Sequence, residues 1–325
     1  HLPWAIRFLR NCTSARAEHI AKSLSSFSSQ ARLAYEEIFD DVDVSNNIVY
    51  KEPIFLYESK KLFEQNQYAF NLRKKYDVQF VVINKEDIAK IEPDLEPIYY
   101  NGVVLKGESF TNSPLEITQK IFNNFIKNDG HFIKIKIKSI VQKDNSLFLK
   151  YEEKEQQFDK IVVAAGAWSN MLARTIGDNF PLDTERGYHI VFENNNNLLT
   201  HPVGWAKTGF YMTPMKDGIR VAGTVEIAGL KKPMNKNMLS MIEKNARSIL
   251  PQLGKVKSEW MGFRPTLPDS LPIIGESQKC KNVYYAFGHQ HLGLSLAAIT
   301  GKVIQSLIEK KNTNINIDAL NPYRF

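Results

Sequence analysis

"YAFGHQHLGLSLAAITG", residues 285–301, is a stretch in which two kinds of pattern meet. The apolar residues before Gly288 are typical of a buried strand, and the small apolar residues after Gly293 are typical of a helix. His289 and His291 lie between the two patterns. Three interpretations fit this histidine pair: metal ligands, a catalytic pair, or a loop whose backbone approaches a bound ligand.

The metal interpretation requires a third ligand beside the histidine pair. The remaining histidines show no spacing that pairs with it: His1, His19, His131, His189 and His201. The loop interpretation rests on the helix that follows, because the N–H groups of its first turn can bind an electron-rich carbonyl or a developing anion. We therefore expect no metal in this stretch.

A second stretch, "IVVAAGAWS" at residues 161–169, repeats the design of strand, glycine and helix. Small residues at the end of a strand, here Ala165 and Gly166, let the backbone come close to a ligand at the carboxyl edge of a sheet. Many buried strands end in glycine only to turn, and Trp168 is of a type common in cores. This stretch, taken alone, fits a ligand-binding role and a purely structural role equally well.

The rest of the chain mixes helical and antiparallel patterns. The alternation of isoleucine and lysine in "HFIKIKIKSI", residues 131–140, predicts a strand with one apolar and one basic face. Short strand candidates between residues 181 and 230 predict an antiparallel sheet. Helical periodicity predicts helices at 17–40, 58–76, 113–130, 235–250 and 291–310.

The composition is that of an ordinary globular protein with room for two domains, since the chain has 325 residues. Its net charge of +7 comes from lysines scattered along the chain, and no basic patch interleaved with aromatic residues predicts nucleic-acid binding. Its two cysteines cannot build a disulfide framework, which predicts a reducing compartment, the cytoplasm. No apolar run approaches the length of a membrane span.

Arg264 lies in "WMGFRPTLPDSLPIIG", residues 260–275, between bulky apolar residues and prolines. In a rigid and largely apolar setting, a guanidinium binds a carboxylate strongly through two parallel hydrogen bonds. A structural arginine that binds a nearby aspartate or a backbone carbonyl fits the stretch equally well.

Four motifs in this order resemble the D-amino-acid oxidase family of flavin-dependent amine oxidases. They are "IVVAAGAWS" (161–169), "ERGYHI" (185–190), "GFRPTLPDSLPIIG" (262–275) and "GHQHLGLSLAAITGK" (288–302). The nearest branch is that of the D-amino-acid dehydrogenase small subunits, which "LPWAIRFLRNC" (2–12) and "VAGTVEIAGL" (221–230) also fit. The likeness covers essentially the whole chain. It implies an α/β (α+β) fold, with a Rossmann-like FAD/NAD(P)-binding domain and a substrate domain that contains an antiparallel sheet.

The resemblance also implies a division of the chain into alternating segments. Residues 1–40 form a helical lead-in, 41–106 and 185–259 the substrate domain, and 107–184 and 260–325 the FAD-binding domain. The family opens with a strand, a G-x-G-x-x-G turn and a helix that hold the FAD pyrophosphate. Since this sequence has no such motif, we expect an N-terminally truncated chain that lacks the first βαβ unit and binds FAD weakly.

By resemblance, one set of residues is expected to contact FAD. It comprises Val141, Ala165, Gly166, Trp168, Gly262, Gly288, His289, Gln290, His291, Leu292, Gly293 and Leu294. Backbone N–H groups around Leu292–Leu294 are expected to face the pyrimidine carbonyl of the flavin. Arg264 is expected to bind the substrate carboxylate as the catalytic residue. Tyr188 and Tyr211 are candidates for a second substrate contact, although core or sheet-surface roles fit both equally well.

The implied activity is oxidative deamination of a D-amino acid to a 2-oxo acid and ammonia, by hydride transfer from Cα to flavin N5. The electrons would pass to a quinone, with peripheral association at the inner face of a bacterial plasma membrane. One alternative is a glycine, sarcosine or cyclic imino-acid oxidase that uses O2, which peroxide formation would reveal. Another is a truncated non-catalytic fragment or an amino-acid-binding module, against which a flavin absorption band would argue.

Overall fold

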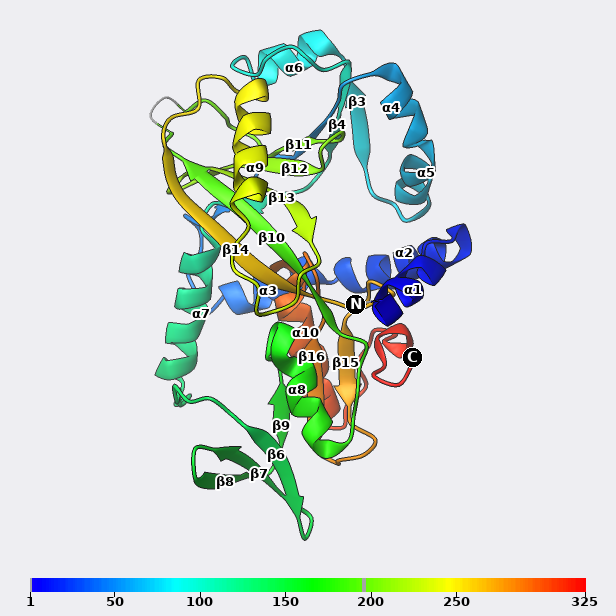
Figure 1. Ribbon diagram of the computed structural model, residues 1–325, viewed down its shortest axis with the longest axis vertical. Helices are drawn as coiled ribbons and strands as arrows, with labels where there is room; N and C mark the ends of the chain where they lie inside the picture. The colour runs from blue at the N-terminus through cyan, green and yellow to red at the C-terminus, as the bar shows by residue number, and fades with distance from the viewer. Residues whose placement is uncertain (1, 195–196) are drawn as a thin grey trace. The chain divides into compact units, whose positions relative to one another are not determined.

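The computed structural model describes residues 2–194 and 197–325 (Figure 1). The chain divides into two compact units, each assembled from separate stretches. Unit 1 contains the N-terminal residues up to Val42, Ile121–Glu185 and Phe263–Phe325, and unit 2 contains Asp43–Lys120 and Arg186–Gly262. The helices predicted as a separate lead-in therefore belong to unit 1.

Unit 2 is built on an eight-stranded sheet with the order β14-β10-β13-β12-β11-β2-β4-β3. Its pairings are antiparallel from β10 to β11 and from β2 to β3, whereas β11 and β2 are parallel. The antiparallel sheet predicted between residues 181 and 230 is therefore confirmed. The strands are β2 Ile54–Tyr57, β3 Phe80–Ile83, β4 Asn101–Leu105, β10 Asp183–Phe192, β11 Val203–Trp205, β12 Phe210–Met215, β13 Gly218–Glu226 and β14 Val256–Thr266.

One face of this sheet is covered by α9 (Lys236–Ile249), which lies along β13 (Figure 1). Leu239, Ile242 and Ala246 recur at helical spacing on α9 and are buried against the sheet. Three shorter helices complete the unit: α4 Lys60–Gln65, α5 Gln67–Lys75 and α6 Lys85–Ile91. A two-stranded ladder joins β1 (Ile48–Val49) to β5 (Phe110–Thr111).

Unit 1 contains the three-stranded sheet β15-β16-β9. Strands β9 (Ile161–Val163) and β16 (Val283–Phe287) are parallel, and β15 (Ile273–Glu276) is antiparallel to β16. Strands β6 (Ser139–Lys143), β7 (Ser146–Tyr151) and β8 (Lys154–Phe158) form a separate antiparallel sheet.

Unit 1 also carries most of the helices. Helix α10 (Gly293–Ile308) packs with α2 (Ser14–Ser28) and α3 (Ala31–Phe39) in one apolar core. The other helical elements are α1 Leu2–Asn11, α8 Ser169–Ala173 and the 3₁₀ turns η1 Gly166–Trp168, η2 Arg174–Ile176 and η3 Asp318–Leu320. The unit boundary at Lys120 falls within α7 (Pro114–Lys127). Among the described residues, no helix is long and apolar enough to cross a membrane.

The prediction of a strand at residues 131–140 is wrong for residues 131–138, which form no strand. The strand β6 begins only at Ser139. Alternating apolar residues specify a strand only when a neighbouring strand satisfies their backbone groups, and none of the described strands pairs with this segment. The side chains of Phe132 and Ile133 are consequently exposed, at 65% and 54%. Strand β9 exposes Val162 at 42%, although all three of its residues are apolar.

Two predicted helices are each divided. The helix expected at 17–40 is α2 and α3, separated at Ser29 and Gln30, where the Ser28 and Ser29 hydroxyls bond to backbone carbonyls. The helix expected at 58–76 is α4 and α5, which meet at Asn66, and its side chain donates to Leu62 O at 2.9 Å. Such side-chain bonds compete with the helical pattern, and apolar periodicity does not reveal them.

Candidate functional site

Two glycine turns lie side by side at one edge of the unit 1 sheet. Strands β9 and β16 run parallel, with Val163 opposite Tyr285. Gly166 follows Val163 by three residues and Gly288 follows Tyr285 by three residues, so both turns leave the carboxyl edge of the sheet at the same level. This edge is where open α/β sheets bind their ligands.

Gly166 and Gly288 both have left-handed backbones, with φ of +54° and +87°. A Cβ at Gly288 would lie 2.6 Å from Leu267 Cδ1, so packing also demands glycine there. A Cβ at Gly166 would meet nothing within 4 Å. The space beside Gly166 is therefore open to a ligand. At Gly288, both the left-handed backbone and the neighbouring Leu267 side chain require glycine.

The N-terminus of α10 follows the Gly288 turn and is not capped by a side chain, since its N-cap residue Leu292 makes no such bond. The first-turn N–H groups and the positive helix end suit an electron-rich carbonyl. Gly293 is not required there by packing, because its Cβ would lie 3.8 Å from its nearest neighbour, His289 Cβ. The Tyr35 hydroxyl donates to the Leu294 carbonyl and so fixes this turn to α3.

The histidine pair is divided between two partners. His289 is half-buried, with Nε2 3.0 Å from Thr300 Oγ1 on α10, and its partial removal from water lowers the pKa of His289 to about 4. His291 faces Glu185, with 3.7 Å between Nε2 and Oε2. Between them, the Gln290 N–H donates to Pro265 O and ties the loop to the end of β14. In the part of the chain that the structure describes, no three His, Cys, Asp or Glu residues group as metal ligands.

Arg264, Glu185 and His291 form a charged cluster in unit 1. Burial lowers the pKa of the Arg264 guanidinium, and the Glu185 carboxylate opposes that shift. Burial raises the pKa of Glu185, which Arg264 opposes in turn. Burial and then the positive charge of Arg264 lower the pKa of His291. Arg264 and Glu185 thus stabilise each other's charge. Sequence reasoning missed Glu185, although it begins the "ERGYHI" motif.

The other expected cofactor residues occupy different places. Ala165 precedes the η1 turn, and Trp168 meets Phe263 edge-on with ring centroids 5.5 Å apart. Val141 lies in β6 opposite Phe148, in the separate three-stranded sheet. Gly262 belongs to unit 2, where its Cβ would lie 1.8 Å from the Trp260 indole. Unit 1 therefore brings together Ala165, Gly166, Arg264 and the 288–294 loop.

Tyr188 and Tyr211 lie on opposite faces of the unit 2 sheet. His189 on β10 pairs with Ala222 on β13, which pairs with Tyr211 on β12. Directly paired residues point to the same face and successive residues to opposite faces. Tyr188 therefore faces the core under α9, and Tyr211 points to the other side.

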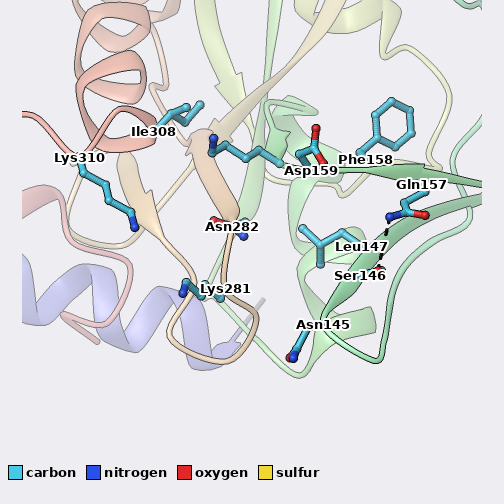
Figure 2. A pocket seen from close by; sticks show the side chains of 11 residues that line it. Asn145, Ser146, Leu147, Gln157, Phe158, Asp159, Lys281, Asn282, Ile308 and Lys310 are labelled. Atoms are coloured by element: carbon cyan, nitrogen blue, oxygen red, sulfur yellow. Dashed lines mark hydrogen bonds between the residues drawn. The ribbon is translucent and has the colours of Figure 1, made fainter.

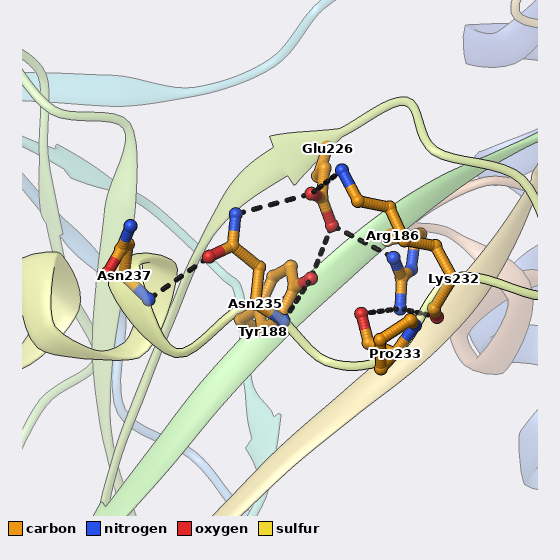
Figure 3. Close-up of polar contacts among 7 residues, drawn as sticks. All are labelled: Arg186, Tyr188, Glu226, Lys232, Pro233, Asn235 and Asn237. Atoms are coloured by element: carbon orange, nitrogen blue, oxygen red, sulfur yellow. Dashed lines mark hydrogen bonds and ion pairs between the residues drawn. The ribbon is translucent and has the colours of Figure 1, made fainter.

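Tyr188 is bonded within the core, with only 1% of its surface exposed. Its hydroxyl donates to Glu226 Oε2 and accepts from Asn235 N at 3.3 Å (Figure 3). The fully buried Arg186 donates to the same Glu226 oxygen at 3.1 Å and to the Lys232 carbonyl at 2.7 Å. This network joins β10, β13 and the segment that leads into α9, which gives Tyr188 a structural role.

Tyr211 is 41% exposed and meets Phe55 edge-on, with centroids 5.4 Å apart. Gly204 lies between them in the pairing, and its Cβ would come within 3.0 Å of the Tyr211 ring. On the same face His189 stacks on Trp260 at 4.8 Å, and burial lowers the pKa of His189 to about 4. Sequence reasoning missed this aromatic face, which is formed by Phe55, Tyr211, His189 and Trp260. The alternation in "YHIVF" (188–192) does separate His189 from the core residues of β10.

A separate hollow of about 400 Å³ lies between β7, β8 and the end of α10 (Figure 2). Lys160, Lys281 and Lys310 line it together with Asp159 and neutral polar groups. None of the predicted site residues lines this hollow.

Comparisons with known proteins agree with this architecture. The family model described as FAD dependent oxidoreductase (DAO) matches residues 7–307. A D-amino-acid oxidase of Bradyrhizobium diazoefficiens is 31% identical over 100% of this chain and 78% of that protein. A D-amino acid dehydrogenase of Paramagnetospirillum magneticum is 23% identical over 99% of this chain and 78% of that protein.

Solved structures share the fold. Glycine oxidase from Geobacillus kaustophilus superposes with a TM-score of 0.83 at 18% identity, covering 93% of this chain and 82% of that one. L-proline dehydrogenase from P. horikoshii superposes with a TM-score of 0.81 at 18% identity, covering 92% and 82%. The family model and the curated relatives agree over nearly the whole length, and the chain belongs to the D-amino-acid oxidase family of FAD-dependent oxidoreductases.

Proposed function

We propose that this protein oxidatively deaminates a D-amino acid to a 2-oxo acid and ammonia, and that its electrons pass to a quinone. Membership of the family and the names of its relatives support the reaction class. The observation that carries the proposal lies within unit 1. Two glycine turns at one sheet edge, an uncapped helix N-terminus and the Arg264 cluster belong to the same compact unit.

Unit 1 is the proposed FAD-binding unit and unit 2 the proposed substrate unit. Open space beside Gly166 and uncapped donors at the start of α10 fit an aromatic ring system with electron-rich carbonyls. Ala165, Gly166 and the 288–294 loop would hold the flavin, with Val141, Trp168 and Gly262 as further proposed contacts. When bound, FAD supplies the acceptor for the hydride of the substrate Cα.

Arg264 would bind the substrate carboxylate and so orient the amino acid. Its guanidinium is half-buried, where a charge-assisted bond is stronger than at a fully exposed position. The Glu185 carboxylate acts on the guanidinium electrostatically, and His291 contributes no second positive charge at neutral pH because its pKa is lowered. Orientation of the reacting bond is the contribution that this unit makes to the rate.

The test compares Arg264→Ala and Arg264→Lys in the FAD-loaded enzyme. Losing a charge-assisted bidentate contact costs about 2–3 kcal/mol, so kcat/KM for a D-amino acid should fall by roughly 30- to 150-fold in Arg264→Ala. Arg174→Ala is the matched control, because Arg174 lies in the same unit and its guanidinium bonds to Asn179 at 2.9 Å. Unchanged kinetics in Arg264→Ala would exclude the carboxylate role.

Product analysis separates the alternatives. Reduction of a soluble quinone without peroxide supports the dehydrogenase. Peroxide formed from glycine or sarcosine as the best substrate would instead favour an oxidase. A protein that shows no flavin absorption after incubation with FAD would favour a non-catalytic or amino-acid-binding chain.

A further inference from the structure

Arg324 and Asp269 form an enclosed ion pair within unit 1, with 12% and 15% of their side chains exposed. Nε of Arg324 donates to Oδ2 of Asp269 at 2.5 Å, and Nη2 donates to Oδ1 at 3.1 Å. Two parallel bonds of this kind are the strongest way in which a guanidinium holds a carboxylate. Nη2 also donates to the Leu271 carbonyl at 2.7 Å, so Arg324 is bound to the segment 265–271 at two points.

The segment 265–271 turns sharply between these two points. Ser270 has a left-handed backbone, with φ of +61°, and its N–H donates to Leu267 O at 3.0 Å. A residue other than glycine keeps such a backbone only where the surrounding contacts impose it. The residues on either side of Ser270 are the two that bond to Arg324, so this ion pair supplies contacts of that kind.

The other side of the same segment contacts the 288–294 loop. The Leu267 side chain is fully buried and packs on Gly288, where a Cβ would lie 2.6 Å from Leu267 Cδ1. Pro265 O accepts the Gln290 N–H at 3.1 Å. Gln290 has a left-handed backbone as well, with φ of +50°. The loop therefore also depends on neighbouring contacts for its conformation, and two of these contacts come from the segment 265–271.

We propose that Arg324 is a positioning residue for the 288–294 loop and that it acts through Asp269 and Leu267. This inference rests on the proposed function, in which the loop holds the flavin. The ion pair fixes the turn at Asp269, and the turn fixes Leu267 beneath the loop. Without the ion pair, a smaller fraction of the molecules has the loop in its binding conformation, and the affinity for FAD falls by the same factor.

Hydrogen exchange measured by mass spectrometry tests this positioning in the flavin-free protein. The amides of residues 288–294 should exchange about tenfold faster in Arg324→Gln, because loss of the charge-assisted bonds makes local opening easier. Arg324→Lys should lie between Arg324→Gln and the unaltered protein, since lysine keeps the charge without the planar fork. The Asp269→Asn/Arg324→Gln double variant should exchange no faster than either single variant, because each single change already breaks the ion pair.

Tyr323→Phe is the matched control, because Tyr323 directly precedes Arg324 and its hydroxyl bonds to other segments. It donates to Asp178 Oδ1 at 2.8 Å and accepts from Gln278 N at 2.6 Å. Tyr323→Phe should lower the free energy of unfolding without faster exchange in the loop. Equally fast exchange of the loop in Tyr323→Phe and Arg324→Gln would mean a general loosening of unit 1 and would overturn the positioning role. Unchanged exchange in Arg324→Gln would overturn it as well.

Flavin binding separates the inference from the proposed reaction. FAD, titrated with flavin fluorescence as the readout, should bind Arg324→Gln about tenfold more weakly than the unaltered protein and Tyr323→Phe as tightly. Equal FAD affinity in Arg324→Gln, or no FAD binding by the unaltered protein, would overturn the role of Arg324 toward the flavin. Weaker FAD binding in Arg324→Gln, in a protein that oxidises no D-amino acid, would keep that role and overturn the proposed reaction.

Discussion

Replacement of Gly166 by alanine separates a glycine that admits a ligand from one that only turns the chain. The φ of Gly166 is +54°, where an L-residue costs about 1–2 kcal/mol. The added Cβ would meet nothing within 4 Å, so no steric term is added to this cost. The expected loss in the free energy of unfolding is therefore about 1–2 kcal/mol, while FAD loses the space that the new methyl group occupies.

Gly209 provides a matched control for this substitution. Its φ is +67° and its Cβ would also meet nothing within 4 Å, but it lies in the turn between β11 and β12 of unit 2. Gly209→Ala should lose the same 1–2 kcal/mol or so for the same backbone reason and should keep its flavin. Gly288→Ala should be the least stable of the three, since overpacking of its Cβ against Leu267 adds about 1–3 kcal/mol.

The assay measures unfolding in urea alongside the flavin retained after gel filtration. We expect Gly166→Ala to lose flavin at a stability equal to that of Gly209→Ala. If Gly166→Ala retains as much flavin as Gly209→Ala, the open space beside Gly166 has no ligand role, and the argument from the paired turns is refuted.

Two further predictions concern stability. Tyr188→Phe removes a hydroxyl bonded to Glu226 and should lower the free energy of unfolding by about 1–3 kcal/mol without raising KM; a raised KM at full stability would restore the substrate role of Tyr188. His289 has a pKa of about 4 when folded and 6.5 as a free side chain, so the unfolded chain binds more protons between these values and stability is lost as the pH falls from about 6.5 to about 4. His289→Gln should make that loss shallower in urea unfolding at pH 4.5 and 7, while His189 and His291, whose pKa values are also lowered, still contribute to it. An unchanged pH slope would contradict the neutral state of His289 in the folded protein.

Residue patterns alone predicted the elements whose signals are local. The buried strand, glycine and helix around Gly288 follow from neighbouring residues, and so do α7, α9 and α10 with their apolar stripes. The family also followed from four motifs in order, and the family model bears it out. The Gly288 loop and the individual strands between residues 181 and 230 likewise follow from patterns along the chain.

Only the tertiary structure decided which distant groups meet. The register of β9 and β16 brings Gly166 level with Gly288. The pairing of β10, β13 and β12 puts Tyr211 on the same face as His189, so Tyr188, one residue earlier on β10, faces the core on the opposite side. Residues 131–138 have the alternation of a strand but no partner among the described strands. Pairing depends on backbone hydrogen bonds between segments far apart in the chain, which local periodicity cannot specify. For the same reason the Glu185 carboxylate near Arg264 became visible only in the folded chain.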